Sequence, residues 1–166
     1  MSSGVVMKPA FFALIFALSF LPRHAFAGEM GRFDSWSAQI TPDACFNISA
    51  AVSSTSMPGR KKPKLAVTDH LSEKLFNAVT VGSGFDDADG ATATIAIDNG
   101  PAFHLLPFNG VGFVSSRLEP ALVEALSRGQ RAVVTWTTPL GGKLTEVYNL
   151  AGFNASRAAA KNACRG

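Results

Sequence analysis

The sequence predicts an all-β fold, a single-domain β-sandwich with two short helices, closed by one disulfide bond. About eight short segments alternate apolar and polar residues or are rich in β-branched residues, with turn-forming residues between them. Two further segments have the start signals and the apolar spacing of short helices. The two cysteines lie near opposite ends of the predicted domain. Short strands joined by short turns favour antiparallel pairing around one core.

The beginning of the chain has the pattern of a secretory signal peptide. Residues 10–21 are apolar except for one serine, and residues 25–27 match an A-x-A cleavage site. The apolar run is shorter than the roughly 20 residues that a transmembrane helix needs. We therefore expect residues 1–27 to be removed and residues 28–166 to form one domain, periplasmic or secreted, with no transmembrane segment.

The charge of the predicted mature domain is nearly balanced. The whole chain has a formal net charge of +3, and loss of Lys8 and Arg23 with the signal peptide lowers it by two. Residues 53–63 are rich in serine, proline and glycine and carry a basic run without the interleaved aromatic residues of a nucleic-acid surface. We interpret this segment as a solvated connection, with a basic recognition loop as the alternative, and expect no nucleic-acid partner.

Cys45 and Cys164 are predicted to form a disulfide bond. Disulfides persist in the oxidising compartments to which a signal peptide leads, and a metal site would need more ligands than two thiols. The bond would close most of the domain into one loop, for which the chain-entropy model gives about 4 to 5 kcal/mol of stabilisation. Two free thiols are the alternative.

The N-terminal half of the domain is predicted to be built from short strands. They are residues 33–40, 45–52, 65–67 and 76–81. In the first of them, Trp36, Ala38 and Ile40 share one face. We expect the first two strands to form a hairpin, residues 53–63 to be a loop, and residues 69–74 to be a polar connector.

The C-terminal half is predicted to hold two further strand pairs. They are residues 92–97 with 102–106, and residues 132–138 with 144–150. Asn99 and Gly100 lie between the strands of the first pair, and this dipeptide accepts positive φ at both central positions of a tight hairpin turn. In the last strand, Glu146 falls on the same, otherwise apolar face as Tyr148.

Two short helices are predicted near the C-terminal end. Residues 118–129 carry an early proline, an apolar stripe and Gly129, which is suited to a left-handed stop. After the last strand, Phe153 is expected to plug the core and Asn154 to cap a helix over residues 155–163. Because this alanine-rich helix is short, it must be held by packing and by the disulfide.

The sequence contains no catalytic constellation with a recognisable spacing, so we expect no catalytic and no cofactor-binding residues. Gly82, Ser83 and Gly84 lack the full G-x-S-x-G frame of a nucleophile elbow. Because a triad is assembled in space, an envelope hydrolase that uses Ser83 with His70 or His104 is an open alternative. A lone strand histidine is otherwise a sheet-face residue.

A cluster of carboxylates at residues 86–89 precedes a glycine, as in calcium-binding loops. In the EF-hand register, however, Phe85 and Ala96 would take the first and last ligand positions, and neither side chain offers an oxygen. We therefore predict a polar turn and no metal site.

Several motifs occur in a recognisable order along the chain. They are the early Trp36, Cys45-Phe46, residues 123–130 before a strand, and residues 148–155 at the start of the last helix. In this order the chain resembles the invasion-associated locus B (invasion-associated protein B) family of exported bacterial proteins. A further cysteine is expected soon after the tryptophan in that family, and residues 37–40 contain none. The resemblance implies a part in host-cell invasion for some members, with no catalytic residues and no cofactor.

Together these observations predict an exported, non-enzymatic envelope protein that binds a partner, either an envelope or host protein or a glycan. A host-interaction or invasion-associated role is what the family resemblance adds. The alternatives are the envelope hydrolase and a small-ligand carrier, which would need an apolar pocket between sheets.

Overall fold

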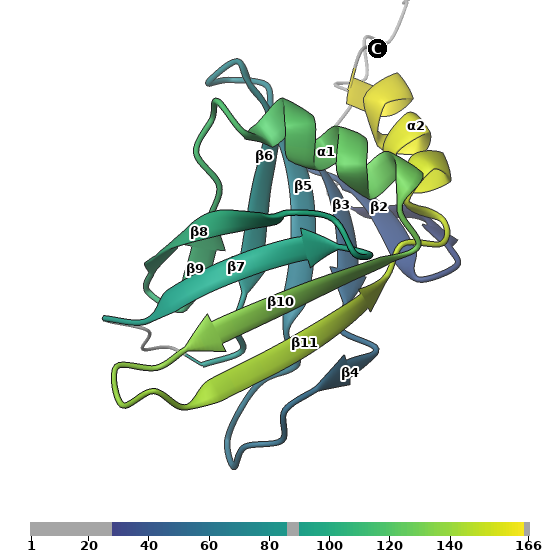
Figure 1. Ribbon diagram of the computed structural model, residues 1–166. Helices are drawn as coiled ribbons and strands as arrows, with labels where there is room; N and C mark the ends of the chain where they lie inside the picture. Colours follow the sequence, from purple (N-terminus) through teal and green to yellow (C-terminus); the bar gives the residue numbers. More distant parts are fainter. Residues whose placement is uncertain (1–27, 86–89, 165–166) are drawn as a thin grey trace, which may run out of the picture.

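The strands form one curled antiparallel sheet, and two helices lie at one end of it (Figure 1). This computed structural model describes residues 28–85 and 90–164, so the predicted signal peptide and the carboxylates of residues 86–89 lie outside the described residues. The strands are β1 (Gly28–Phe33), β2 (Trp36–Ile40), β3 (Ala44–Ala50), β4 (Ser53–Ser54), β5 (Lys64–His70), β6 (Leu75–Gly82), β7 (Thr92–Ile97), β8 (Ala102–Phe108), β9 (Val111–Phe113), β10 (Arg131–Thr137) and β11 (Lys143–Asn149). The helices are α1 (Glu119–Arg128) and α2 (Phe153–Cys164). The predicted all-β fold with two short helices is confirmed.

The sheet is continuous from one end to the other, in the order β1-β2-β3-β5-β6-β9-β8-β7-β10-β11-β4. Strand β8 pairs with β9 along one edge and with β7 along the other, which joins the two groups of strands. Strand β4 follows β3 closely in the chain but pairs with β11. The last strands of the sheet therefore lie near its first strands. The two separate sheets of the predicted sandwich are therefore not confirmed, because one sheet encloses the core by curling.

The concave face of this sheet holds the hydrophobic core. Alternate residues of β10 and β11 are buried, as the period-two pattern predicts. The largest fully buried side chains include Trp36, Trp136, Tyr148 and Phe153. The rings of Phe153 and Trp36 meet edge to face with centroids 4.8 Å apart, which confirms that Phe153 plugs the core.

Several strands differ from the predicted ones. The hairpin of the first two predicted strands is confirmed as β2 and β3, but β1 and β9 were not predicted. Strand β4 lies inside residues 53–63, which were expected to be a loop. Strand β5 continues through Asp69 and His70, which were expected in a polar connector. The cause is pairing with β3, where Asp69 lies opposite Cys45 and His70 opposite Ala44.

The two Asn-Gly dipeptides behave differently. Strands β7 and β8 pair as predicted, but the positive φ of their connection is at Asp98 (50°) and not at Asn99 or Gly100. The Asp98 carboxylate accepts the backbone N–H of Arg131 at 3.0 Å, which ties this turn to the start of β10. The second dipeptide, Asn109-Gly110, has positive φ at both residues and forms the tight turn between β8 and β9.

Gly129 ends α1 by a different mechanism from the predicted one. Its φ of −81° and ψ of 169° are extended, so it does not form a left-handed stop. A Cβ atom at this position would lie 2.3 Å from Cγ2 of Ile97. Glycine is therefore required at position 129 because β7 approaches the end of the helix closely, which leaves no room for a side chain.

Asn154 is not the N-cap of the last helix, since α2 already begins at Phe153. Its side-chain N–H donates instead to the carbonyl oxygen of Ser127 at 2.8 Å, which joins the start of α2 to the end of α1. Gly152, with a φ of 87°, turns the chain into the helix. A Cβ atom on Gly152 would lie 1.9 Å from the carbonyl oxygen of Phe33.

The predicted disulfide is confirmed. It joins Cys45 in β3 to Cys164, the last residue of α2, with Cα atoms 6.2 Å apart. Helix α2 packs against β1, β2 and β3, where Ala38, Cys45 and Ala160 form a small cluster separate from the main core. The bond therefore fixes the end of the chain to the first strands.

Removal of the disulfide is expected to lower the free energy of unfolding. The double variant Cys45→Ala, Cys164→Ala loses the loop constraint, which typically costs about 2 to 5 kcal/mol. Urea denaturation measures the loss, and a reducing agent should lower the stability of the native chain but not that of the double variant. Two reactive thiols per chain in the denatured, unreduced protein would contradict the bond.

Gly152→Ala is expected to destabilise the protein far more than Gly141→Ala. Both glycines have positive φ, which costs a residue with a Cβ atom about 1 to 2 kcal/mol. A Cβ atom on Gly141 meets nothing within 4 Å, whereas one on Gly152 collides with backbone. Thermal and urea denaturation should show a total loss of about 3 kcal/mol or more for Gly152→Ala. Equal losses in the two variants would refute the role of the close approach.

Candidate functional site

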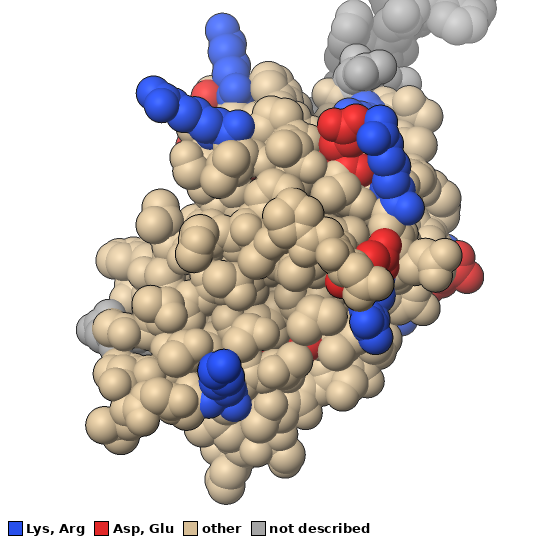
Figure 2. Space-filling model, viewed as in Figure 1, with Lys and Arg blue, Asp and Glu red and all other residues tan. Residues whose placement is uncertain are grey.

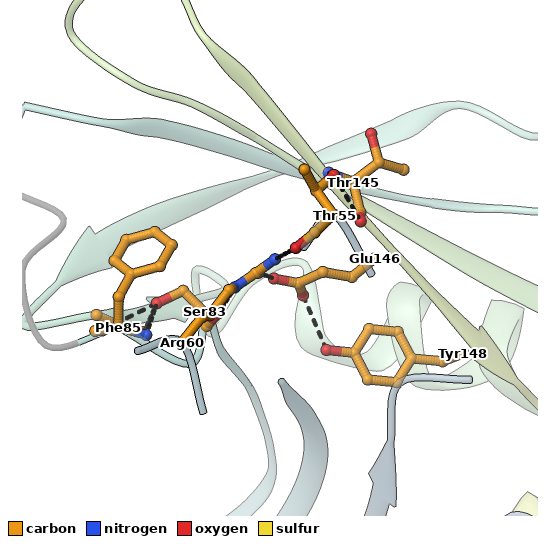
Figure 3. A network of polar contacts seen from close by, with 8 residues as sticks. Thr55, Arg60, Ser83, Phe85, Thr145, Glu146 and Tyr148 are labelled. Carbon is orange, nitrogen blue, oxygen red and sulfur yellow. Dashed lines mark hydrogen bonds and ion pairs between the residues drawn. The ribbon is translucent and has the colours of Figure 1, made fainter. Parts of the chain in front are cut away.

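The most prominent polar feature of the interior is a buried network around Arg60 and Glu146 (Figure 3). Glu146 lies in the middle of β11, where the alternation that buries Leu144 and Tyr148 also turns its carboxylate inward. Arg60 reaches the carboxylate from the segment between β4 and β5. Their side chains are 4% and 0% exposed, so this ion pair is almost fully removed from water.

The guanidinium of Arg60 joins several segments that lie far apart in the sequence. Its Nε donates to the carbonyl oxygen of Ser83 at 2.7 Å, and another of its N–H groups donates to that of Thr55 at 2.8 Å. A third N–H group donates to Oε1 of Glu146. The group also lies over the ring of Phe85, 5.6 Å from the centroid. Arg60 therefore holds three parts of the chain together, which are its own segment, the segment after β6 and strand β11.

Burial dominates the acid–base behaviour of this network. It raises the pKa of Glu146 to about 7, although the Tyr148 hydroxyl and the charge of Arg60 lower it. Tyr148 donates to Oε2 at 2.9 Å, and burial raises the pKa of its own hydroxyl. The indole of Trp136 also lowers the pKa of Glu146, although its N–H makes no hydrogen bond of standard geometry with the described residues. The carboxyl group can thus change its charge near neutral pH.

The part of the network that the sequence did not reveal is Arg60. Residues 53–63 were interpreted as a solvated connection, and Lys61 and Lys62 are indeed exposed, but the Arg60 side chain is buried. The position of Glu146 in the sequence did indicate a buried polar network, because a carboxylate on an otherwise apolar strand face requires a buried partner. The sequence could not identify which cation supplies it.

The raised pKa of Glu146 predicts how stability depends on pH. A carboxyl group with a pKa of about 7 in the folded chain and an ordinary value of 4.5 binds more protons in the folded state between these values. Its contribution is therefore fully present below pH 4.5 and is lost as the pH rises through 7, by an amount on the order of 3 kcal/mol.

The measurement is the free energy of urea unfolding at pH 5 and pH 8. Glu146→Gln should remove this part of the pH dependence, whereas Glu124→Gln, in an exposed ion pair with Arg128, should retain it. Parallel pH profiles for the native chain and Glu146→Gln would contradict the assignment.

The structure does not bring Ser83 into hydrogen-bond contact with His70 or His104, the residues of the hydrolase alternative. Ser83 is fully buried, and its hydroxyl donates to the carbonyl oxygen of Gly110 at 2.8 Å. The hydrogen-bond partners of this oxygen are backbone groups, and neither histidine is among them. His104 is exposed on β8, while His70 packs edge to face against the ring of Phe46. Ser83 therefore fastens the segment after β6 to the turn between β8 and β9.

A second buried charge cluster fastens α2 to the sheet. The Asp69 carboxylate accepts the N–H of Asn77 at 2.8 Å, and an N–H group of Arg157 donates to Oδ1 of Asn77. Arg157 also lies 3.7 Å from Oδ1 of Asp69, which opposes the lowering of the Arg157 pKa by burial. Asn77 has a φ of 66°, at an irregularity in the pairing of β5 with β6. In this position Asn77 contacts both Asp69 of β5 and Arg157 of α2.

The outer face of β8 and β9 exposes large apolar side chains. Leu106, Phe108 and Phe113 are 63%, 66% and 40% exposed. Leu106 pairs directly with Phe113, and Phe108 with Val111, so these side chains lie on one side of the sheet. Figure 2 shows a broad area without charged side chains over β7, β8 and β10. We define Leu106, Phe108, Val111 and Phe113 as the apolar face.

Within residues 28–85 and 90–164, no three His, Cys, Asp or Glu side chains are grouped in a way that could hold a metal ion. A surface depression of about 660 Å³ lies at the ends of β10 and β11. Its lining residues are Val52, Asp98, Asn99, Gln130, Arg131, Val147, Tyr148 and Asn149. Neither helix in the described part of the chain has the length and apolar character needed to cross a membrane.

The comparisons with known proteins do not assign the chain to a family. No protein-family model matches it, and no curated protein and no solved structure gives a significant match. The resemblance to the invasion-associated locus B family stays a prediction from the motifs.

Proposed function

We propose that this chain is an exported, non-enzymatic envelope protein that binds a partner protein through the apolar face. The observation that carries the proposal is the exposure of Leu106, Phe108 and Phe113 on adjacent strands. Large apolar side chains grouped on a surface characterise recognition sites, whereas single ones are ordinary. The signal-peptide pattern and the disulfide support export to an oxidising compartment.

The charge distribution favours a particular chemistry for the partner. From Ala91 to Val114, Asp98 is the sole charged residue, and it is engaged by the backbone at the start of β10. Such a surface lacks the groups that would recognise an ionic partner, and the centre of a protein interface is depleted in charge and enriched in aromatic residues. We therefore favour a protein with an apolar patch over a glycan, and a host-cell contact is the setting that the family resemblance adds.

Substitution of Phe108 should disrupt partner binding without affecting the fold. The oxidised protein, recovered from the envelope fraction of cells that express the whole chain, serves as bait for envelope extract. Mass spectrometry of this protein checks the predicted removal of residues 1–27 and should find Gly28 at its N-terminus. Loss of a central aromatic contact typically costs about 2 kcal/mol or more, so Phe108→Ser should raise the Kd by more than about tenfold.

Leu140→Ser is the matched control, because Leu140 is 98% exposed but lies in the turn between β10 and β11. It should retain the same partner as the native chain. Retention of no protein, or equal retention by Phe108→Ser, would reject the proposal. Binding to a glycan alone would replace the protein partner with the glycan alternative.

A further inference from the structure

We propose that Arg60 and Glu146 form a proton-operated latch, which holds residues 56–60 in place while Glu146 is ionised and releases them when it is protonated. This inference does not depend on the proposed partner. It concerns the segment between β4 and β5, whose only deeply buried charged side chain among the described residues is that of Arg60.

The segment has few other attachments. At its start, the Thr55 N–H donates to the carbonyl oxygen of Thr145 at 2.9 Å, and at its end, the Lys61 N–H donates to that of Gly84 at 2.7 Å. Residues 56–59 between these points are exposed. Arg60 alone passes beneath them, to Glu146 and to the carbonyl oxygens of Ser83 and Thr55 (Figure 3). Loss of this one side chain from the interior would leave the segment held at its two ends.

The charges around the carboxylate explain the direction of the change. Glu146 and Tyr148 come from β11, Trp136 from β10 and Arg60 from the segment itself. The segment after β6 contributes the Ser83 carbonyl and the Phe85 ring, which are uncharged. Arg60 is thus the only described cation that acts on Glu146, and Glu146 balances its charge. Protonation of Glu146 leaves a buried guanidinium without a counter-ion.

A guanidinium cannot lose its proton in the physiological range, so it cannot relieve this burial by becoming neutral. An unpaired buried charge is strongly unfavourable, and water is within reach because the adjoining residues are exposed. Arg60 therefore moves out to solvent and carries residues 56–59 with it, while Thr55 and Lys61 keep their backbone contacts. Since burial raises the pKa of Glu146 to about 7, the change occurs near neutral pH.

Limited trypsin digestion of the native chain tests the release directly. Trypsin cleaves after Arg60 and Lys61, and its rate at each pH is normalised with a small peptide substrate. Lowering the pH from 8 to 6 raises the protonated fraction of a group with a pKa of 7 about tenfold, and normalised cleavage in this segment should rise by a similar factor. A normalised rate that is the same at both pH values would overturn the proposal.

Variants distinguish the latch from a general loosening of the fold. Glu146→Gln should be cleaved rapidly at both pH values, whereas Glu124→Gln should behave as the native chain does. In ¹⁵N NMR spectra, the amides of Thr55 and Lys61 should titrate with one midpoint in the native chain and show no such midpoint in Glu146→Gln. The same titration in Glu146→Gln would assign the change to a group other than Glu146 and reject the latch. If this variant does not fold, the native-chain digestion still decides the outcome.

Discussion

Contacts between the first strands and the last segment of the chain hold the sheet in its curled form. The Trp36 indole donates to the carbonyl oxygen of Asn149 at 3.0 Å, and the ring of Phe153 packs against Trp36. The disulfide between Cys45 and Cys164 adds a covalent link in the same region. A curled sheet removes its concave apolar face from water only while its distant strands stay together. The burial of the core therefore depends on these long-range contacts.

The interior combines this apolar core with two charged clusters, and each fastens an element that the strand ladder does not hold. Arg60 and Glu146 fasten the segment between β4 and β5, while Asp69 and Arg157 fasten α2. A buried ion pair adds little net stability, because desolvation offsets the attraction of the charges. These pairs instead determine where each element packs, since a segment that bears a buried charge can pack only where the oppositely charged partner lies.

The two faces of the sheet have different roles. The concave face determines stability and carries the titratable network around Glu146. The convex face of β8 and β9 carries Leu106, Phe108 and Phe113, which the fold itself leaves exposed. Burial of this surface against another protein would gain free energy without rearrangement of the core. The proposed binding surface and the proposed latch are thus separate features that can be tested independently.

The sequence by itself determined the features that depend on neighbours along the chain. Period-two alternation located most strands, the two cysteines identified the disulfide, and the placement of Glu146 on a buried face followed from the same alternation. Only the tertiary structure decided that one sheet curls on itself, that Asn109-Gly110 is the dipeptide with positive φ, and that Arg60 is buried. These features arise from strand pairing and charge burial between segments distant in sequence, which local residue patterns do not encode.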